Sequence, residues 1–223
     1  MTPISRKSRA SKYEVILWDN DGVLVDTERL YFEATRSVFH EQGVDLTMDL
    51  YFEYFLEGSR GTSRLARERG LSEDVLREMQ HRRGLRYQEM LEREDLVIDG
   101  VRETLESLKT LYPMSIVTSA PREYFDSIHS RTGLLECFEF VIARGDYANS
   151  KPAPDPYLTA IERCGLPKSQ CLAIEDSPRG LAAAQAAGIE CWIIPNELTR
   201  RADFSAATRV LESISEVPNI LLS

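Results

Sequence analysis

The stretch that decides the fold is VILWDNDGVLVDTE, residues 15–28. Its first four residues are continuously apolar, which is typical of a strand covered by helices on both faces. Asp19 and Asp21 follow at once, and Gly22 then supplies the conformational freedom of a turn. An Asp-Gly pair after a strand is more often a plain turn than a functional site, so the rest of the chain has to decide between the two.

Four further apolar runs of strand length follow this stretch. They occupy residues 114–117, 138–143, 171–174 and 191–194. Helical patterns lie between them: Val101, Leu105 and Leu108 repeat at helical spacing, and Ser177 with Pro178 can begin a helix. Strands that alternate with helices predict an α/β fold, a Rossmann-like parallel sheet with helices on both faces.

Residues 27–96 break this alternation because they contain no convincing strand. Leu71, Val75, Leu76 and Met79 are spaced as on an amphipathic helix. We therefore expect an α-helical domain at 27–96, inserted into a core formed by residues 13–26 and 97–223, with a flexible basic tail at 1–12. The two hinges should lie near residues 26–28 and 95–100.

The charge balance excludes several kinds of partner. The chain has 27 basic and 36 acidic residues, a net charge of −9, and its first twelve residues contain four bases and no acid. The rest of the chain is therefore strongly acidic and repels nucleic acids and anionic membranes. No apolar run approaches the roughly 20 residues that span a bilayer, and no signal peptide is evident. We expect a cytoplasmic protein with a small-molecule partner.

Polar residues follow four of the predicted strands. They are Asp19, Asp21, Thr118, Ser119, Lys151, Glu175 and Asp176. Each group has a simpler explanation: Asp176-Ser177 as a helix cap, Thr118-Ser119 as the start of a helix, and Lys151 as a solvated surface charge. In an open parallel sheet, however, the carboxyl ends of the strands meet at one edge, where ligands bind.

Four carboxylates at one edge repel each other unless a cation joins them. Together the groups therefore favour a metal site over four unrelated turns and caps. A ligand set made only of oxygen suits Mg²⁺ and argues against zinc. The hydroxyl of Thr118 and the ammonium of Lys151 would suit a phosphate beside that ion.

Four motifs in this order resemble those of the haloacid dehalogenase-like superfamily, within it the phosphatases and mutases related to β-phosphoglucomutase and phosphoglycolate phosphatase. They are Asp-x-Asp-Gly-Val-Leu-x-Asp-Thr-Glu at 19–28, Thr118, Lys-Pro-x-Pro-Asp-Pro at 151–156 and Glu-Asp-Ser-x-x-Gly-x-x-Ala-Ala-x-x-Ala-Gly at 175–188. The helical insertion lies where that family carries its cap domain.

The resemblance implies a role for each matching residue. Asp19 is the expected nucleophile, which forms an aspartyl-phosphate, and Asp21 the expected general acid and base. The expected phosphate-binding residues are Thr118, Ser119 and Lys151, the last also counted as catalytic. The expected Mg²⁺ ligands are Asp19, the backbone carbonyl of Asp21, and Asp176, with Glu175 either a further ligand or a residue that supports the ligands. Because a nucleophilic carboxylate must be ionised, we expect the pKa of Asp19 not to be raised.

Residues of the insertion bear on the choice between hydrolase and mutase. Tyr31 stands where the sugar-phosphate mutase of the family has a histidine linked to cap closure, and a phenol cannot replace an imidazole as a proton switch at neutral pH. Gly58, Arg60 and Arg83 loosely match substrate-facing positions, although such arginines are ordinarily solvated surface charges.

The sequence therefore favours Mg²⁺-dependent hydrolysis of a small phosphorylated metabolite. The alternatives are a phosphosugar mutase and, from another class, a catalytically silent binding protein on the same fold. A dehalogenase is disfavoured because Asp21, which dehalogenation does not need, is present.

Overall fold

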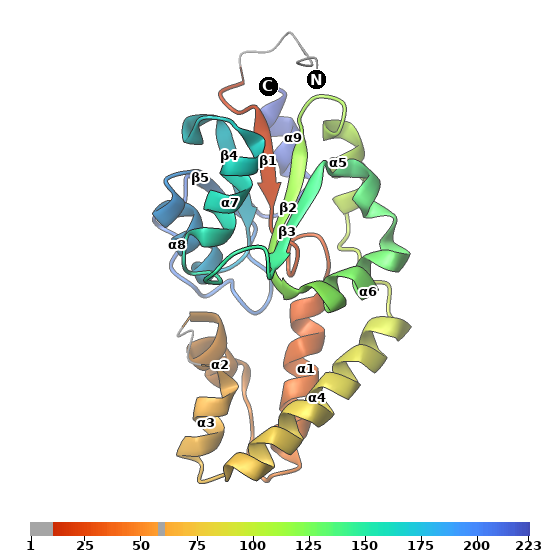
Figure 1. The fold of residues 1–223 in the computed structure, drawn as a ribbon, viewed down its shortest axis with the longest axis vertical. Coiled ribbons are helices and arrows are strands. Elements are labelled where there is room, and N and C mark those ends of the chain that lie inside the picture. The colour runs from red at the N-terminus through yellow and green to blue at the C-terminus, as the bar shows by residue number, and fades with distance from the viewer. Residues whose placement is uncertain (1–10, 58–60) are drawn as a thin grey trace.

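The structure of the chain is a computed structural model that describes residues 11–57 and 61–223. Most of the tail expected at 1–12 lies outside these residues, as do Gly58 and Arg60. The described chain has two parts: a sheet with helices on both faces and, at the lower end of Figure 1, a separate group of helices.

The sheet has six strands in the order β3-β2-β1-β4-β5-β6, and every adjacent pair is parallel. Their bounds are β1 Val15–Trp18, β2 Met114–Pro121, β3 Phe140–Arg144, β4 Cys171–Glu175, β5 Glu190–Ile193 and β6 Arg209–Val210. The five predicted strands and the α/β fold are confirmed. The edge strand β6 was not predicted, because its two exposed residues carry no hydrophobic pattern.

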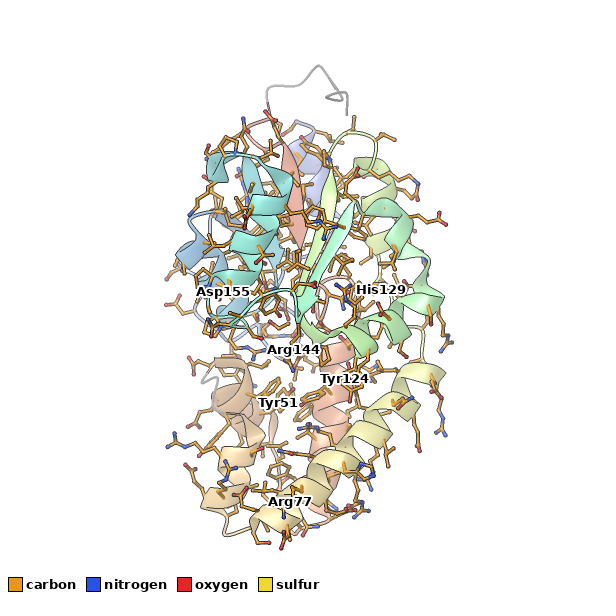
Figure 2. All side chains as sticks on the ribbon, viewed as in Figure 1. Tyr51, Arg77, Tyr124, His129, Arg144 and Asp155 are labelled. Atoms are coloured by element: carbon orange, nitrogen blue, oxygen red, sulfur yellow. The ribbon has the colours of Figure 1, made fainter. Side chains whose placement is uncertain are left out.

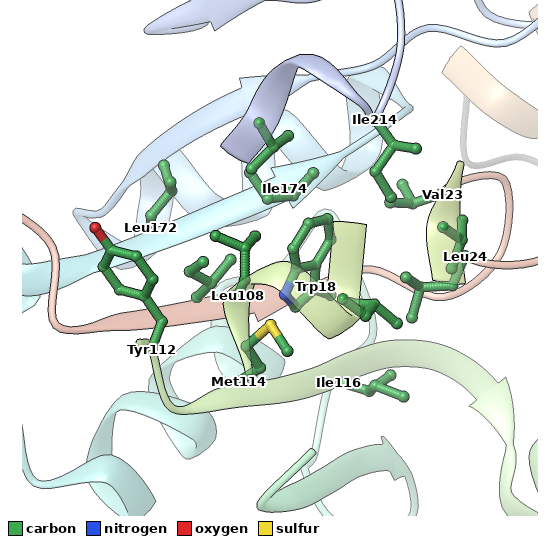
Figure 3. Packing of buried hydrophobic residues seen from close by; sticks show 14 of the residues in the cluster. Trp18, Val23, Leu24, Leu108, Tyr112, Met114, Ile116, Leu172, Ile174 and Ile214 are labelled. Atoms are coloured by element: carbon green, nitrogen blue, oxygen red, sulfur yellow. The ribbon is translucent and has the colours of Figure 1, made fainter. Parts of the chain in front are cut away.

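Each face of the sheet is covered by its own helices. One face packs against α5 Val101–Leu108, α6 Arg122–Thr132 and α9 Glu216–Leu221, and the other against α7 Asp155–Cys164 and α8 Pro178–Ala187. Strand β1 contributes side chains to the hydrophobic cores on both faces of the sheet. Ile16 and Trp18 point to the first face, and Val15 and Leu17 point to the second. Figure 3 shows Trp18 at the centre of the first core.

Short helical turns complete the sheet part, at η2 Leu134–Cys137 and η3 Lys168–Gln170. The helix predicted after the fourth strand is confirmed as α8: the hydroxyl of Ser177 accepts from the backbone N–H of Gly180 at 3.2 Å, and Pro178 stands at its first turn.

The helical part lies between the first two strands of the chain. It comprises α1 Thr27–His40, α2 Met48–Tyr51, the π-helical η1 Phe52–Glu57, α3 Thr62–Glu68 and α4 Glu73–Arg93. It has its own buried cluster, which includes Phe39, Leu46 and Leu76. None of the helices in the described part of the chain is long and apolar enough to cross a membrane.

The two segments that connect the parts lie side by side. Val25 and Val97 form an antiparallel bridge, and the N–H of Asp26 donates to the carbonyl of Leu96 at 2.8 Å. These positions coincide with the expected hinges. The division into a core domain and a cap domain stays a prediction.

Candidate active site

The turn after β1 presents Asp19 and Asp21 at the carboxyl edge of the sheet. The carbonyl of Asn20 holds this turn by accepting from the N–H groups of Leu24 at 2.9 Å and Val25 at 3.1 Å. Gly22 has φ +88°, and a Cβ there would lie 2.3 Å from Oδ2 of Asp176. Only glycine therefore allows the turn to approach the end of β4.

A buried lysine joins the ends of three strands. Nζ of Lys151 donates to Oδ1 of Asp19 at 2.5 Å, to Oε1 of Glu175 at 2.6 Å and to the carbonyl of Val117 at 2.7 Å. Burial opposes its charge, but the attraction of the two carboxylates outweighs burial and raises the pKa of Lys151. The lysine is thus a permanent cation that fixes Asp19.

Three buried carboxylates meet beside this lysine. Asp19, Glu175 and Asp176 each have an oxygen within 4.8 Å of the others. Burial raises the pKa of Asp19 well above its usual range, and Glu175 adds to this while Lys151 opposes it. Burial and the charge of Asp19 likewise raise the pKa of Asp176. The expectation that the pKa of Asp19 is not raised is therefore wrong for the side chains taken alone.

This donor set fits a hard divalent cation. All its atoms are oxygens, and a cation would favour the ionised carboxylates that burial and mutual repulsion disfavour. Glu175 is the less available ligand, because its Oε1 accepts from Lys151 and, at 2.7 Å, from the hydroxyl of Tyr157, and its Oε2 accepts from the N–H of Asp176 at 3.3 Å. Within the described chain, Asp19 and Asp176 each accept on one carboxylate oxygen and keep the other for a cation.

Two residues that sequence reasoning missed orient this cluster. Nδ2 of Asn196, in the loop after β5, donates to Oδ2 of Asp176 at 2.7 Å, and Tyr157 of α7 donates to Glu175. Neither residue forms a recognisable pattern with its neighbours in sequence. Only the packing of α7 and of the loop against the sheet edge reveals them.

The carboxylate of Asp21 is held by two hydroxyls. Thr27 donates to its Oδ1 at 2.6 Å and Thr118 to its Oδ2 at 2.8 Å. The hydroxyl of Thr118 thus faces Asp21, and its predicted contact with phosphate stays a prediction. Next to it, Oγ of Ser119 is buried without a hydrogen-bond partner and lines the cavity described below. An orphaned hydroxyl in such a place is suited to a ligand.

A cavity of about 320 Å³ lies between the sheet edge and the helical part. Asp19, Asp21 and Lys151 line one side, and Tyr31 and Arg83 of the helical part line the other. The structure therefore brings together the predicted residues of both parts, apart from Gly58 and Arg60, which the structure does not describe.

Tyr31 is enclosed by other rings. It stacks on Phe55 with centroids 5.4 Å apart and meets the edge of Tyr87 at 5.4 Å. Burial raises the pKa of its phenol. Tyr31 is therefore a neutral wall of the cavity at physiological pH.

The side chain of Asn20 points away from the cavity into the protein. Its Oδ1 lies 2.7 Å from Nε2 of His129, and Nδ1 of the same ring lies 2.9 Å from Oγ1 of Thr132. Burial lowers the pKa of His129 to about 4, so the ring is neutral at pH 7. With Thr132 donating to Nδ1, Nε2 carries the proton and donates to Asn20.

Comparisons with known proteins bear on the family of the chain. The family model described as haloacid dehalogenase-like hydrolase matches residues 16–194, which confirms the resemblance noted from the motifs. The chain is 33% identical to protein CbbY of Rhodobacter capsulatus over 205 residues, covering 87% of this chain and 90% of that protein. It is also 33% identical to the phosphorylated carbohydrates phosphatase of Thermotoga maritima, covering 79% and 82%.

Solved structures show the same architecture. CbbY from Rhodobacter sphaeroides in complex with phosphate has a TM-score of 0.77 at 26% identity, covering 92% of this chain and 96% of that one. A mutant of the same protein is solved in complex with xylulose-(1,5)bisphosphate, also with a TM-score of 0.77.

Proposed function

The chain belongs to the haloacid dehalogenase-like hydrolases, and from this premise we propose that it is a Mg²⁺-dependent phosphatase that hydrolyses a small phosphorylated metabolite. The observation that carries the proposal is the contact of Nζ of Lys151 with both Asp19 and Glu175 at the base of the cavity. Names of relatives support the class of reaction, since one is a phosphatase of phosphorylated carbohydrates.

The chemistry begins at Asp19. Its carboxylate oxygen attacks the phosphorus, the ester P–O bond breaks, and the leaving oxygen takes a proton from Asp21. A water molecule then gives its proton to Asp21 and attacks the aspartyl-phosphate, which releases inorganic phosphate and restores Asp19. Thr27 and Thr118 hold Asp21 in place for both transfers.

Lys151 and Ser119 receive the phosphate. Lys151 neutralises charge between Asp19 and the phosphate oxygens, and the orphaned hydroxyl of Ser119 gains an acceptor when a phosphate enters. Mg²⁺ held by Asp19, Asp176 and the backbone carbonyl of Asp21, with Glu175 close by, would offset the repulsion between these carboxylates and the phosphate.

The helical part serves as a cap over this site. Tyr31, Arg83 and Tyr87 come from α1 and α4 and line the cavity opposite the carboxylates. Hydrolysis is favoured over a mutase reaction because Tyr31 is a neutral ring in an aromatic cluster, which supplies no proton-linked gate.

The test is a panel of phosphorylated sugars, polyols, nucleotides and phosphoglycolate, assayed for inorganic phosphate with Mg²⁺. We expect release from at least one sugar phosphate and none with Asp19→Asn. A separate assay supplies β-glucose 1-phosphate with a trace of glucose 1,6-bisphosphate. Stoichiometric formation of glucose 6-phosphate with little release of free phosphate would show that the protein is a mutase and would refute the proposed hydrolase activity.

A further inference from the structure

The loop after β5 contacts both the carboxylate cluster and the helical part. At the cluster, Nδ2 of Asn196 donates to Oδ2 of Asp176 at 2.7 Å. The same nitrogen lies close to the turn after β1, because a Cβ at Gly22 would lie 2.7 Å from it. Asn196 is therefore enclosed between the end of β4 and the turn after β1, where it supports Asp176.

The side chain of Asn196 is tied to the residues that follow it. Its Oδ1 accepts from the N–H of Leu198 at 2.9 Å and from the N–H and the hydroxyl of Thr199 at 3.2 and 3.3 Å. The hydroxyl of Thr199 in turn accepts from the N–H of Asn196 at 3.1 Å. Residues 196–199 therefore form one tight turn, and a displacement of Leu198 displaces the amide of Asn196.

The half-buried side chain of Leu198 packs on the helical part. It lies against the buried cluster of that part, and among the described residues that pack there Leu198 alone comes from outside residues 27–96. Figure 2 shows Tyr51, a member of the cluster, near the boundary between the two parts. The turn that supports Asp176 is thus also anchored on the helical part.

An ion pair at the same loop adds little to this anchor. Arg201 pairs with Asp49 of α2 at 2.6 Å, but both side chains are 78% exposed. Such pairs contribute little because water and salt screen the two charges. Leu198 is therefore the contact through which the position of the helical part acts on the loop.

The place of this contact makes it sensitive to opening of the cavity. Figure 1 shows α2 below α8, on the opposite side of the molecule from the connection between α4 and α5. A rotation of the helical part about that connection moves α2 and its neighbours farther than it moves the residues at the connection. Such a rotation separates Leu198 from the cluster on which it packs.

We propose that Asn196 and Leu198 are positioning residues that couple Mg²⁺ binding to the contact between the helical part and the loop. With Leu198 in contact, the turn directs the amide of Asn196 to Oδ2 of Asp176 and leaves the other oxygen for the ion. When the helical part moves away, the amide loses this support and Asp176 becomes a poorer ligand. Coupling between two equilibria is reciprocal, so Mg²⁺ favours the closed arrangement by the same factor.

This inference rests on the proposed function, because it takes the carboxylate cluster as the Mg²⁺ site. Calorimetry with Mg²⁺ alone tests it without turnover. Asn196→Ala should weaken Mg²⁺ binding by about 10- to 100-fold, the usual cost of losing a group that orients a metal ligand. Leu198→Ala removes no contact to a carboxylate, yet it should weaken Mg²⁺ binding by about fivefold or more.

The double variant shows whether the effect of Leu198 passes through Asn196. In the Asn196→Ala background, Leu198→Ala should change the Mg²⁺ dissociation constant by less than about twofold, because the coupling is already lost. Additive effects of the two substitutions would contradict the proposed route.

Two control variants separate positioning from packing. Val75→Ala truncates another half-buried side chain on the same cluster, but one within the helical part. It should lower the melting temperature, as Leu198→Ala does, and leave the Mg²⁺ dissociation constant unchanged. Leu198→Met keeps an apolar side chain of similar volume and should bind Mg²⁺ within about twofold of wild type.

A second measurement decides the question even if Leu198→Ala does not fold. Hydrogen exchange of the amides in α2 and in residues 197–201 should be slower at saturating Mg²⁺ than without it in wild type, and equal in Asn196→Ala. Equal exchange with and without Mg²⁺ in wild type would overturn the coupling.

The outcomes separate this inference from the proposed function. A Mg²⁺ dissociation constant of Leu198→Ala equal to that of wild type would refute the coupling and leave the phosphatase intact. If no substrate releases phosphate but Mg²⁺ affinity depends on Leu198 as expected, the proposed function fails and the coupling stands. If wild type binds no Mg²⁺, the metal requirement and the coupling are both refuted.

Discussion

His129→Leu should destabilise the protein from a position outside the cavity. It removes the donor to Oδ1 of Asn20, a side chain with no exposed surface whose Nδ2 already lacks a partner. A buried polar group left unpaired costs about 1–3 kcal/mol. We expect the free energy of unfolding at pH 7 to fall by that amount, and the melting temperature by about 2–4 °C for each kcal/mol.

The same histidine also gives stability a pH dependence of definite sign. Burial lowers its pKa from 6.5 to about 4, against the opposing charges of Asp21 and Asp126. Below pH 6.5 the unfolded chain therefore binds a proton that the folded chain does not. The titration of His129 therefore leaves the free energy of unfolding unchanged above pH 6.5. As the pH falls from 6.5 towards 4, that free energy decreases by about 3 kcal/mol in all, at 1.36 kcal/mol per pH unit.

Urea unfolding followed by tryptophan fluorescence, at about pH 7 and about pH 4.8, measures both effects. The advantage of wild type over His129→Leu should shrink by about 2 kcal/mol at the lower pH, because the variant has no residue there to protonate. The control Asn20→Leu/His129→Leu removes both polar partners and should recover most of the stability at pH 7. Equal stability of wild type and His129→Leu at pH 7, or identical pH dependence, would refute the reasoning.

Three further predictions concern the carboxylates. Asp19→Asn should lower turnover by several powers of ten without unfolding the protein, while Asp21→Asn should cripple turnover yet trap phosphate on Asp19, visible by mass spectrometry. EDTA should abolish activity and Mg²⁺ restore it, and Asp176→Ala should raise the Mg²⁺ concentration needed for half-maximal rate; full activity in EDTA would contradict the metal site. Gly180→Ala should destabilise the protein by about 1–3 kcal/mol in thermal unfolding, since a Cβ there would lie 1.8 Å from the carboxylate of Glu175; an unchanged melting temperature would show that Glu175 can move.

The core of the site was predictable from the sequence because all strands of a parallel sheet run in the same direction. Continuous apolar runs identify the strands, and whatever follows each strand must arrive at the same edge. Asp19, Lys151 and Asp176 are more than twenty residues apart, yet this rule alone places them together, and the structure joins Asp19 to Lys151 at 2.5 Å. The helical insertion was also predictable, since its apolar residues recur at helical spacing and none of its segments has the pattern of a strand.

The partners of these residues were not predictable, because they depend on how whole elements pack. Asn196 reaches Asp176 from a loop, Tyr157 reaches Glu175 from α7, and His129 reaches Asn20 from α6. The raised pKa of Asp19 has the same origin, since burial and the charge of Glu175 act only in the folded chain.

The arginines show the division most clearly. By sequence alone Arg82 and Arg144 are ordinary surface cations, and only a loose match to a substrate-facing position distinguishes Arg83 from them. Residue type and periodicity determine that a helix forms and which residues share a face. The interaction energy of a charged side chain depends instead on the distance to other charges and on its burial, which the fold sets. Only the tertiary structure places Glu41 beside Arg82 and leaves Arg83 and Arg144 to line the cavity.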